Sequence, residues 1–247
     1  MFRPVARRSL AAGVFEQLRD RIVGGDVKPG TTLPAERALA VMLGVNRNAV
    51  REGLKRLEQA GLVAVHHGGG TRVLDFKRSA GLEVLQAMLV RGDGTIDTRV
   101  CRGIVEMRTR LAPTVGGLAA ERATRANDAA LAAIVARMRK AKGDARALSR
   151  LALDFWAEVV AATDNLALEL SFNSLDASYG SVLEQLQNVM ADEVSATADY
   201  AALAEAIRKR ESKAAAACAE RIVARGHAAF TKLLEQIDAV QTKSKRR

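Results

Sequence analysis

Residues 33–73 read LPAERALAVMLGVNRNAVREGLKRLEQAGLVAVHHGGGTRV, in which two short helical patterns precede a hairpin pattern. The first helix is expected to begin near Pro34, because proline at a first helical turn loses no needed N–H and Glu36 suits the positive end of the helix dipole. An apolar stripe then starts at Leu39. Gly44 follows, where a left-handed cap costs little, so we expect the helix to end there.

The second helical pattern starts after Asn46, a residue type that commonly caps helix N-termini. Val50, Leu54 and Leu57 are spaced to face inward. The polar residues that can face outward are Arg47, Asn48, Arg51 and Lys55. A short helix, a tight turn and a second helix form the geometry in which the second helix enters the major groove of DNA with its N-terminal residues at the base edges. The sequence therefore predicts that this segment reads duplex DNA.

The residues after the second helix predict a two-stranded hairpin. Strand patterns at 62–65 and 71–74 flank a turn that is rich in glycine, including Gly68. Glycine lets the backbone approach a phosphate or the minor groove closely, and His67 and Arg72 can donate hydrogen bonds there. We interpret the hairpin as a DNA-binding wing, and the alternative is a plain surface hairpin.

Motifs with fixed spacings run through residues 9–75. They are Ser9-Leu10, Gly25-x-x-x-Pro29-Gly30, Leu33-Pro34-x-Glu36-Arg37, Gly44-Val45-x-Arg47-x-x-Val50-Arg51-Glu52 and Gly69-x-Thr71-x-Val73. Together they resemble the winged helix-turn-helix domain of the GntR family of bacterial transcription regulators. The resemblance implies DNA contacts by Arg37, Arg47 and Arg51. It implies a further contact by the wing residue His67.

Asn46 and Asn48 depart from this family, whose recognition turn often carries Ser or Thr. Both amides can still hydrogen-bond a base or a phosphate. Arg37 has a structural alternative, an ion pair with Glu36 or Glu52 at the surface. The candidate DNA-binding residues are therefore Arg37, Asn46, Arg47, Asn48, Arg51, His67, Gly68 and Arg72.

Length and composition predict two domains rather than one, since the chain has 247 residues and 49% of them are hydrophobic. No apolar run approaches the ~20 residues of a membrane span, and the N-terminus lacks the apolar segment of a secretion signal. We therefore expect a cytoplasmic protein without a membrane partner. Cys101 and Cys218 are isolated in the sequence, so both are interpreted as small, reduced hydrophobic residues rather than metal or disulfide partners.

Positive charge is concentrated near the two ends of the chain, whose net charge is +10. Residues 1–76, the predicted DNA-binding domain, contain 12 Lys or Arg and 7 Asp or Glu. A basic domain attracts phosphates and makes DNA binding fall with salt. Residues 239–247 contain four basic residues and no acidic one, and we expect them to form a disordered tail.

Residues 77–94 are predicted to be a linker, and residues 95–238 to be an all-α effector-binding and dimerisation domain. Helical periodicity recurs at about 98–122, 126–142, 144–163, 165–174, 176–192, 196–210 and 212–237. The expected fold is mainly α, with an N-terminal winged helix-turn-helix that includes a small β-hairpin and a C-terminal antiparallel helical bundle. Bundles of this kind commonly build ligand sites between facing helices.

Several segments of the helical half share a family pattern. They are Glu106-x-Arg108, 118–124, Leu153-x-Phe155-Trp156 leading to 162–165, and Glu205-Ala206-Ile207. They resemble the all-helical effector domain of the FadR branch of the GntR family. The resemblance implies a homodimer, a short inverted-repeat operator and a small-molecule effector. It also implies that Arg108 can face the effector cavity, where its guanidinium suits a carboxylate or phosphate, whereas the alternative is surface pairing with Glu106 or Asp97.

Many members of that branch bind a divalent metal through an Asp and three His. The resemblance places Ala152, Trp156, Tyr200 and Ile222 at those positions. Ala, Trp and Ile offer no suitable donor, so we predict no metal site and no cofactor. Trp156 and Tyr200 either fill the presumed pocket as plain core or line it for a larger or more apolar effector.

Two regulatory hypotheses and one enzymatic hypothesis remain to be compared. The sequence contains no Ser/His/Asp set, no phosphate-binding glycine loop before a helix and no paired metal ligands, which argues against an enzyme. The favoured hypothesis is a dimeric, metabolite-responsive repressor of a catabolic or metabolic operon. The alternative is a DNA-binding dimer of the same fold whose C-terminal domain is occluded and independent of an effector.

Overall fold

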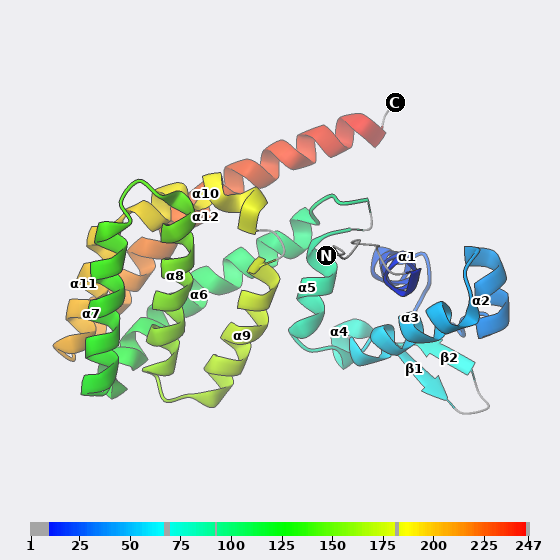
Figure 1. Ribbon diagram of the computed structural model, residues 1–247, viewed down its shortest axis with the longest axis horizontal. Coiled ribbons are helices and arrows are strands. Elements are labelled where there is room, and N and C mark those ends of the chain that lie inside the picture. The colour runs from blue at the N-terminus through cyan, green and yellow to red at the C-terminus, as the bar shows by residue number, and fades with distance from the viewer. Residues whose placement is uncertain (1–9, 67–69, 92, 181–182, 246–247) are drawn as a thin grey trace, which may run out of the picture. The chain divides into compact units, whose positions relative to one another are not determined.

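The computed structural model describes residues 10–66, 70–91, 93–180 and 183–245, and it is mainly helical with one β-hairpin (Figure 1). The chain divides into two units, Met1–Asp97 and Thr98–Arg247. This agrees with the predicted fold class, a winged helix-turn-helix followed by a helical bundle. Each unit has its own buried side chains.

The first unit contains the two predicted DNA-reading helices and the hairpin. Its elements are α1 (Leu10–Gly24), α2 (Glu36–Leu43), α3 (Arg47–Gln59), β1 (Val63–His66), β2 (Gly70–Val73), α4 (Phe76–Ser79) and α5 (Glu83–Leu89). Helix α2 ends at Gly44, whose φ of +64° is the left-handed conformation expected there. Helix α3 starts after Asn46, whose side chain accepts a hydrogen bond of 2.8 Å from the Ala49 N–H. The two caps therefore set the tight turn between the helices.

The hairpin is antiparallel, with Val63 opposite Val73 and His66 opposite Gly70. A segment before α2 extends this pairing, because the Leu33 N–H donates to the Thr71 carbonyl at 2.8 Å. The strands are thereby tied to the chain that leads into the helix-turn-helix. The turn residues 67–69 lie outside the described residues.

Helix α3 packs closely on α1 because glycine occupies position 53. A Cβ at Gly53 would lie 2.6 Å from Cγ1 of Val14 and 3.3 Å from the Ala11 carbonyl oxygen. Val14 is itself buried, so it has little room to move. This close approach fixes how α3 lies on the unit that carries it.

The described residues of the second unit form seven helices. They are α6 (Thr98–Arg122), α7 (Arg125–Lys140), α8 (Ala145–Ala161), α9 (Leu166–Gly180), α10 (Leu183–Ser195), α11 (Thr197–Arg208) and α12 (Ser212–Lys245). Helix α12 packs along α6, while α7 contacts both α8 and α11 (Figure 1). Glycine again permits a close approach of two helices, α6 and α12, since a Cβ at Gly116 would lie 2.9 Å from the Ala219 Cβ.

Three boundaries differ from those expected from sequence. The predicted linker at 77–94 contains most of α4 and all of α5 within the first unit. Helix α9 continues to Gly180 instead of ending near 174, and α12 is helical to Lys245, whereas we expected disorder from 239. The added residues, 175–180 in α9 and 239–245 in α12, contain no Pro, and the one Gly among them is the last residue of α9. These segments therefore lack the residue types that usually end a helix.

The Gly53→Ala substitution is expected to destabilise the first unit by roughly 1–3 kcal/mol, because the added methyl group overpacks the α1–α3 contact. Gly13→Ala on α1 is the matched control, since a Cβ there meets nothing within 4 Å. It should stabilise the unit by roughly 0.5–1 kcal/mol through helix propensity. Hydrogen exchange of the α3 amides in the full chain measures both effects, and equal protection in the two variants would contradict the packing argument.

Candidate DNA interface and helical pocket

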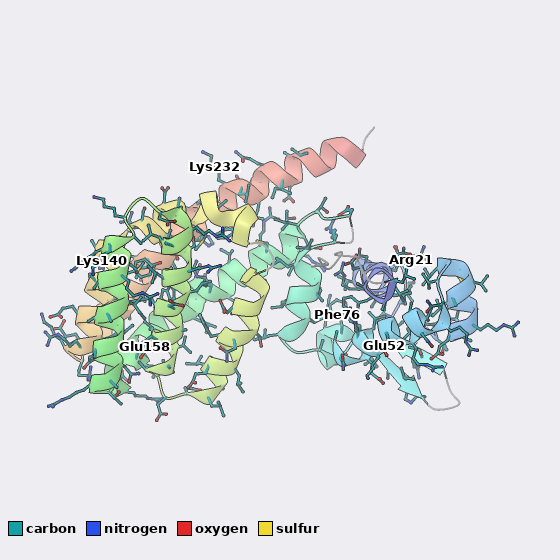
Figure 2. All side chains as sticks on the ribbon, viewed as in Figure 1. Arg21, Glu52, Phe76, Lys140, Glu158 and Lys232 are labelled. Carbon is teal, nitrogen blue, oxygen red and sulfur yellow. The ribbon has the colours of Figure 1, made fainter. Side chains whose placement is uncertain are left out.

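The N-terminal half of α3 separates an apolar face from a basic one. Val50 is 0% exposed and Leu54 is 3% exposed, so one face is buried in the unit. Arg47, Asn48 and Arg51 are all exposed outside that buried face, as is Glu52, which is labelled in Figure 2. The sequence prediction placed these polar residues outward, and the helix presents them so.

Arg51 forms an ion pair that sequence reasoning did not identify. Its Nη2 lies 3.0 Å from Oε2 of Glu36, and its Nε donates to Oε1 at 3.3 Å. These hydrogen bonds hold the pKa of the Glu36 carboxyl below its ordinary value. The pair connects α2 to α3 and orients the Arg51 guanidinium at the surface. Arg37, which we considered as the partner of Glu36, is exposed.

The two asparagines of the turn have different roles in the structure. Asn46 uses its Oδ1 to cap α3, which leaves its side-chain NH₂ group as a donor toward the outside. Asn48 lies within the first turn of α3 and is exposed. A cap at this position orders the end of the helix that carries Arg47.

The hairpin is held to the rest of the first unit at both strands. The Arg72 Nε on β2 donates to the Gly30 carbonyl at 3.1 Å, and the Val65 N–H on β1 donates to Oε1 of Glu58 at 3.0 Å. Arg72 is otherwise exposed and can offer further N–H groups. His67 and Gly68, the other wing candidates, lie outside the described residues.

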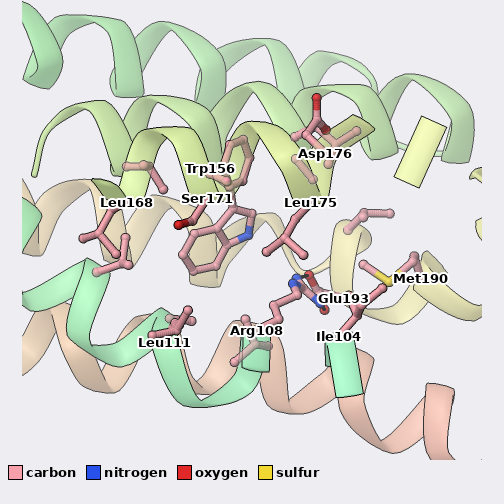
Figure 3. Close-up of a pocket in the computed structure, with 18 of the residues that line it drawn as sticks. Ile104, Arg108, Leu111, Trp156, Leu168, Ser171, Leu175, Asp176, Met190 and Glu193 are labelled. Carbon is pink, nitrogen blue, oxygen red and sulfur yellow. Dashed lines mark hydrogen bonds and ion pairs between the residues drawn. The ribbon is translucent and has the colours of Figure 1, made fainter. Parts of the chain in front are cut away.

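A cavity of about 120 Å³ lies among α6, α8, α9, α10 and α12 of the second unit (Figure 3). Most of its lining is apolar, with Ile104, Leu111, Leu175 and Met190 among the side chains. The polar or ionisable residues in the lining are Arg108, Ser149, Ser171, Asp176 and Glu193, together with the indole of Trp156. The helical bundle therefore has the kind of internal space that its sequence led us to expect.

Arg108 lines this cavity, as the family resemblance implied, and is paired there with Glu193. Its Nη1 donates to Oε2 of Glu193 at 3.0 Å, and its Nη2 contacts Oε1. The Glu193 side chain is 0% exposed and that of Arg108 is 18% exposed. The two residues are 85 positions apart, so no local spacing could have revealed the pair.

The neighbouring helix leaves room for this buried carboxylate. A Cβ at Gly226 on α12 would overlap Oε2 of Glu193. A side chain at that position would therefore require the end of the Glu193 side chain to shift away from its present place. The sequence signal for the pair was therefore a glycine inside a long helix, where its low helix propensity needs a packing reason.

Trp156 and Tyr200, which were predicted together as pocket residues, have different positions relative to the cavity. Trp156 is 8% exposed and lines the cavity, whereas Tyr200 is fully buried and is not one of the described lining residues. The Tyr200 ring instead packs edge-on against Phe155, with ring centroids 5.1 Å apart. Burial raises the pKa of Tyr200 well above its ordinary value, and the nearby Glu193 carboxylate raises it further. The Arg108 charge and the nearby Trp156 indole act in the opposite direction but do not outweigh burial.

The residues at the family's metal-binding positions are all buried. Ala152 lines the cavity beside Trp156, and Ile222 is completely buried. Within the described ranges, no group of three or more His, Cys, Asp or Glu side chains is arranged to hold a metal ion. His227 is exposed, and its Nδ1 lies 3.4 Å from the Thr109 hydroxyl.

For the portion of the chain that the structure covers, no helix has the length and apolarity to cross a membrane.

A winged helix-turn-helix with an exposed basic helix, joined to a helical bundle, defines the class of bacterial DNA-binding transcription regulators. Residues 10–73 match the family described as bacterial regulatory proteins, gntR family, and residues 103–242 match the FCD domain. The chain belongs to the GntR family, in its FadR-like branch with an FCD domain. Proteins of this family are transcription regulators and not enzymes.

Similar proteins agree with this membership. The HTH-type transcriptional regulator Mce2R of Mycobacterium tuberculosis is 42% identical over 207 residues, covering 83% of this chain and 84% of that protein. A fatty acid metabolism regulator protein of Serratia proteamaculans is 28% identical over 175 residues, or 71% of each chain. The structure of Lar from Listeria monocytogenes has a TM-score of 0.58, 16% identity, and covers 93% of this chain and 100% of that one, which shows a shared fold.

We expect Glu36→Gln to raise the affinity of the full chain for any duplex by roughly threefold at low salt, because it removes a negative charge beside Arg51 and frees that guanidinium for phosphate. Glu52→Gln is the control, with the same charge change at an exposed neighbour on α3. Fluorescence anisotropy across a salt series measures both variants. A smaller gain for Glu36→Gln than for Glu52→Gln would show that the Arg51 pair does not limit DNA binding.

Proposed function

We propose that this protein is a homodimeric, metabolite-responsive repressor that places one α3 in each half of a short inverted repeat. The observation that carries the proposal is the exposed basic face of α3 above a fully buried apolar face. A two-fold dimer matches the symmetry of an inverted repeat, so each copy reads one half-site. The regulated operon is proposed to be catabolic or metabolic, and the protein to act in the cytoplasm.

Base and phosphate contacts are assigned to different parts of the first unit. Arg47 and Asn48 lie in the first turn of α3 and are assigned to base edges, with Arg51 one turn further along. The other proposed contacts, to phosphates or the minor groove, come from Arg37, Asn46, His67, Gly68 and Arg72. Phosphate contacts set register and contribute most of the salt dependence, whereas base contacts select the operator.

The cavity supports an effector-binding role for the second unit over the alternative of an occluded, effector-independent domain. Arg108 and Trp156 both line it, so they are the proposed effector-pocket residues, whereas Tyr200 supports the pocket from behind as core. An effector that releases DNA must bind the DNA-free state more tightly, and it shifts the equilibrium only by that difference in affinity. The name of the Serratia relative refers to fatty acid metabolism, which is compatible with a metabolic signal.

A surface on α9 supports association of two copies. Leu166 and Leu170 lie one helical turn apart and are 69% and 57% exposed. Large apolar side chains that share an exposed helix face are typical of a surface that another protein covers. We assign this face to the contact between the two copies.

We expect Arg47→Ala to weaken specific operator binding by roughly 1–3 kcal/mol, because a bidentate contact to guanine is lost. Arg56→Ala, an exposed arginine about half a helical rotation away on α3, is the control and should have a smaller effect. Footprinting both variants on the promoter that the wild-type protein protects provides the measurement. Unchanged protection by Arg47→Ala would remove this residue from the readout.

Leu170→Glu is expected to shift the protein from dimer to monomer, because a carboxylate would have to be buried in the interface. Sedimentation velocity at micromolar concentration measures the mass, and the same sample should lose footprinting of both half-sites together. The exposed substitution Ala133→Glu, which lies on α7 and not on this face, is the control for added charge. A dimeric Leu170→Glu would exclude this face of α9 as the contact between copies.

A further inference from the structure

We infer that the cavity of the second unit takes a neutral, mainly apolar molecule with one hydrogen-bond acceptor, such as an ester or ketone carbonyl, and that it disfavours carboxylates. The inference rests on the proposed effector role of this cavity and adds the chemical class of its ligand. Three features of the lining support this inference. They are the paired state of Arg108, the unpaired indole N–H of Trp156 and the apolar remainder.

The charge that would attract an anion is already neutralised. Arg108 donates to both oxygens of Glu193, whose side chain has no solvent exposure. An incoming carboxylate that took the guanidinium would leave Glu193 buried without its counter-charge, which is strongly unfavourable. The anion would also meet Asp176, a second carboxyl group in the same lining. The local charge balance therefore opposes a negatively charged ligand.

A hydrogen-bond donor in the lining lacks a partner. The Nε1–H of Trp156 is buried and forms no hydrogen bond of normal geometry among the described residues, and the Tyr200 hydroxyl that lies near it is likewise unsatisfied. Figure 3 shows the indole among the lining side chains, with its nitrogen on the side of Leu175 and of the Arg108–Glu193 pair. Buried donors are nearly always satisfied, and an unsatisfied one costs free energy. A ligand oxygen that accepts from this N–H removes that cost.

The remaining lining fits the apolar body of such a molecule. Ile104, Leu111, Leu175 and Met190 approach from three different helices, and methionine adapts to irregular shapes. The volume of about 120 Å³ is comparable to that of an apolar cavity of ~150 Å³ that holds benzene. Leu111 is 37% exposed, so the lining reaches the surface at α6. These dimensions suit a compact molecule or a short chain.

The chain's single tryptophan makes the cavity directly observable. The full-length protein is titrated with methyl hexanoate, hexanoate and hexane at pH 7.5, and Trp156 emission is recorded. Methyl hexanoate should bind saturably and at least tenfold more tightly than hexanoate. It should also bind more tightly than hexane, which has no acceptor. Equal or tighter binding of hexanoate would overturn the charge argument, and equal binding of hexane would overturn the role of the N–H.

Glu193→Gln tests the reason for the selectivity. The substitution keeps the size of the side chain but leaves the Arg108 charge uncompensated, so hexanoate should gain at least tenfold in affinity while methyl hexanoate stays within twofold. Asp192→Asn removes the same charge from an exposed neighbour on α10 and should change neither. An unchanged preference in a folded Glu193→Gln protein would refute the proposal.

Trp156→Phe provides an independent variant that does not disturb the ion pair. Removing the indole donor should reduce the affinity for methyl hexanoate about fivefold and leave hexane unaffected, as measured by calorimetry. Loss of both affinities in equal measure would show that the indole acts only as packing and would overturn its donor role. All these measurements are made without DNA, so a failure here is distinguishable from a failure of Arg47→Ala to weaken the operator footprint.

Discussion

The buried carboxylate of Glu193 is the constraint around which the second unit is arranged. An ionised group without solvent must be paired, and Arg108 provides that pairing from α6 to α10. Helix α12 contributes the empty space at Gly226 into which the carboxylate fits. Removing one partner of a buried pair typically costs roughly 3–5 kcal/mol. Three of the five helices around the cavity are thus positioned by one electrostatic contact, and the same contact determines what charge the cavity accepts.

The DNA-binding unit depends on a different kind of constraint, which is close backbone approach. Gly53 lets α3 lie against α1, so the apolar side of α3 is buried and its basic side must face outward. Asn46 then fixes where α3 begins, and the Glu36–Arg51 pair connects it to α2. The way in which α3 packs on α1 therefore determines which of its arginine side chains are exposed. A rigid base of this kind preorganises the side chains that the proposed readout uses.

Local patterns in the sequence predicted the fold well, because caps and apolar periodicity act over a few residues. Asn46 caps α3, Gly44 ends α2, and α6 has the predicted bounds of 98–122. The partners of Arg108 and Arg51 were not predictable, since they lie 85 and 15 positions away and any of several carboxylates had suitable chemistry. Helix ends were also missed where no breaker marks them, as in α12. The surface position of the α3 residues and the cavity position of Arg108 and Trp156 thus followed from local patterns, whereas the ion pairs did not.

Gly226 has an evolutionary consequence. Because a methyl group at this position would overlap the end of the Glu193 side chain, a change at one position alters the space available at the other. A descendant that replaces Glu193 with a shorter, neutral side chain makes room for alanine at position 226, and it leaves Arg108 with an unopposed positive charge. The exchange on α10 would thus convert the chamber from anion-rejecting to anion-attracting. A regulator could in this way come to answer a different class of chemical signal while its DNA-reading head stayed unaltered.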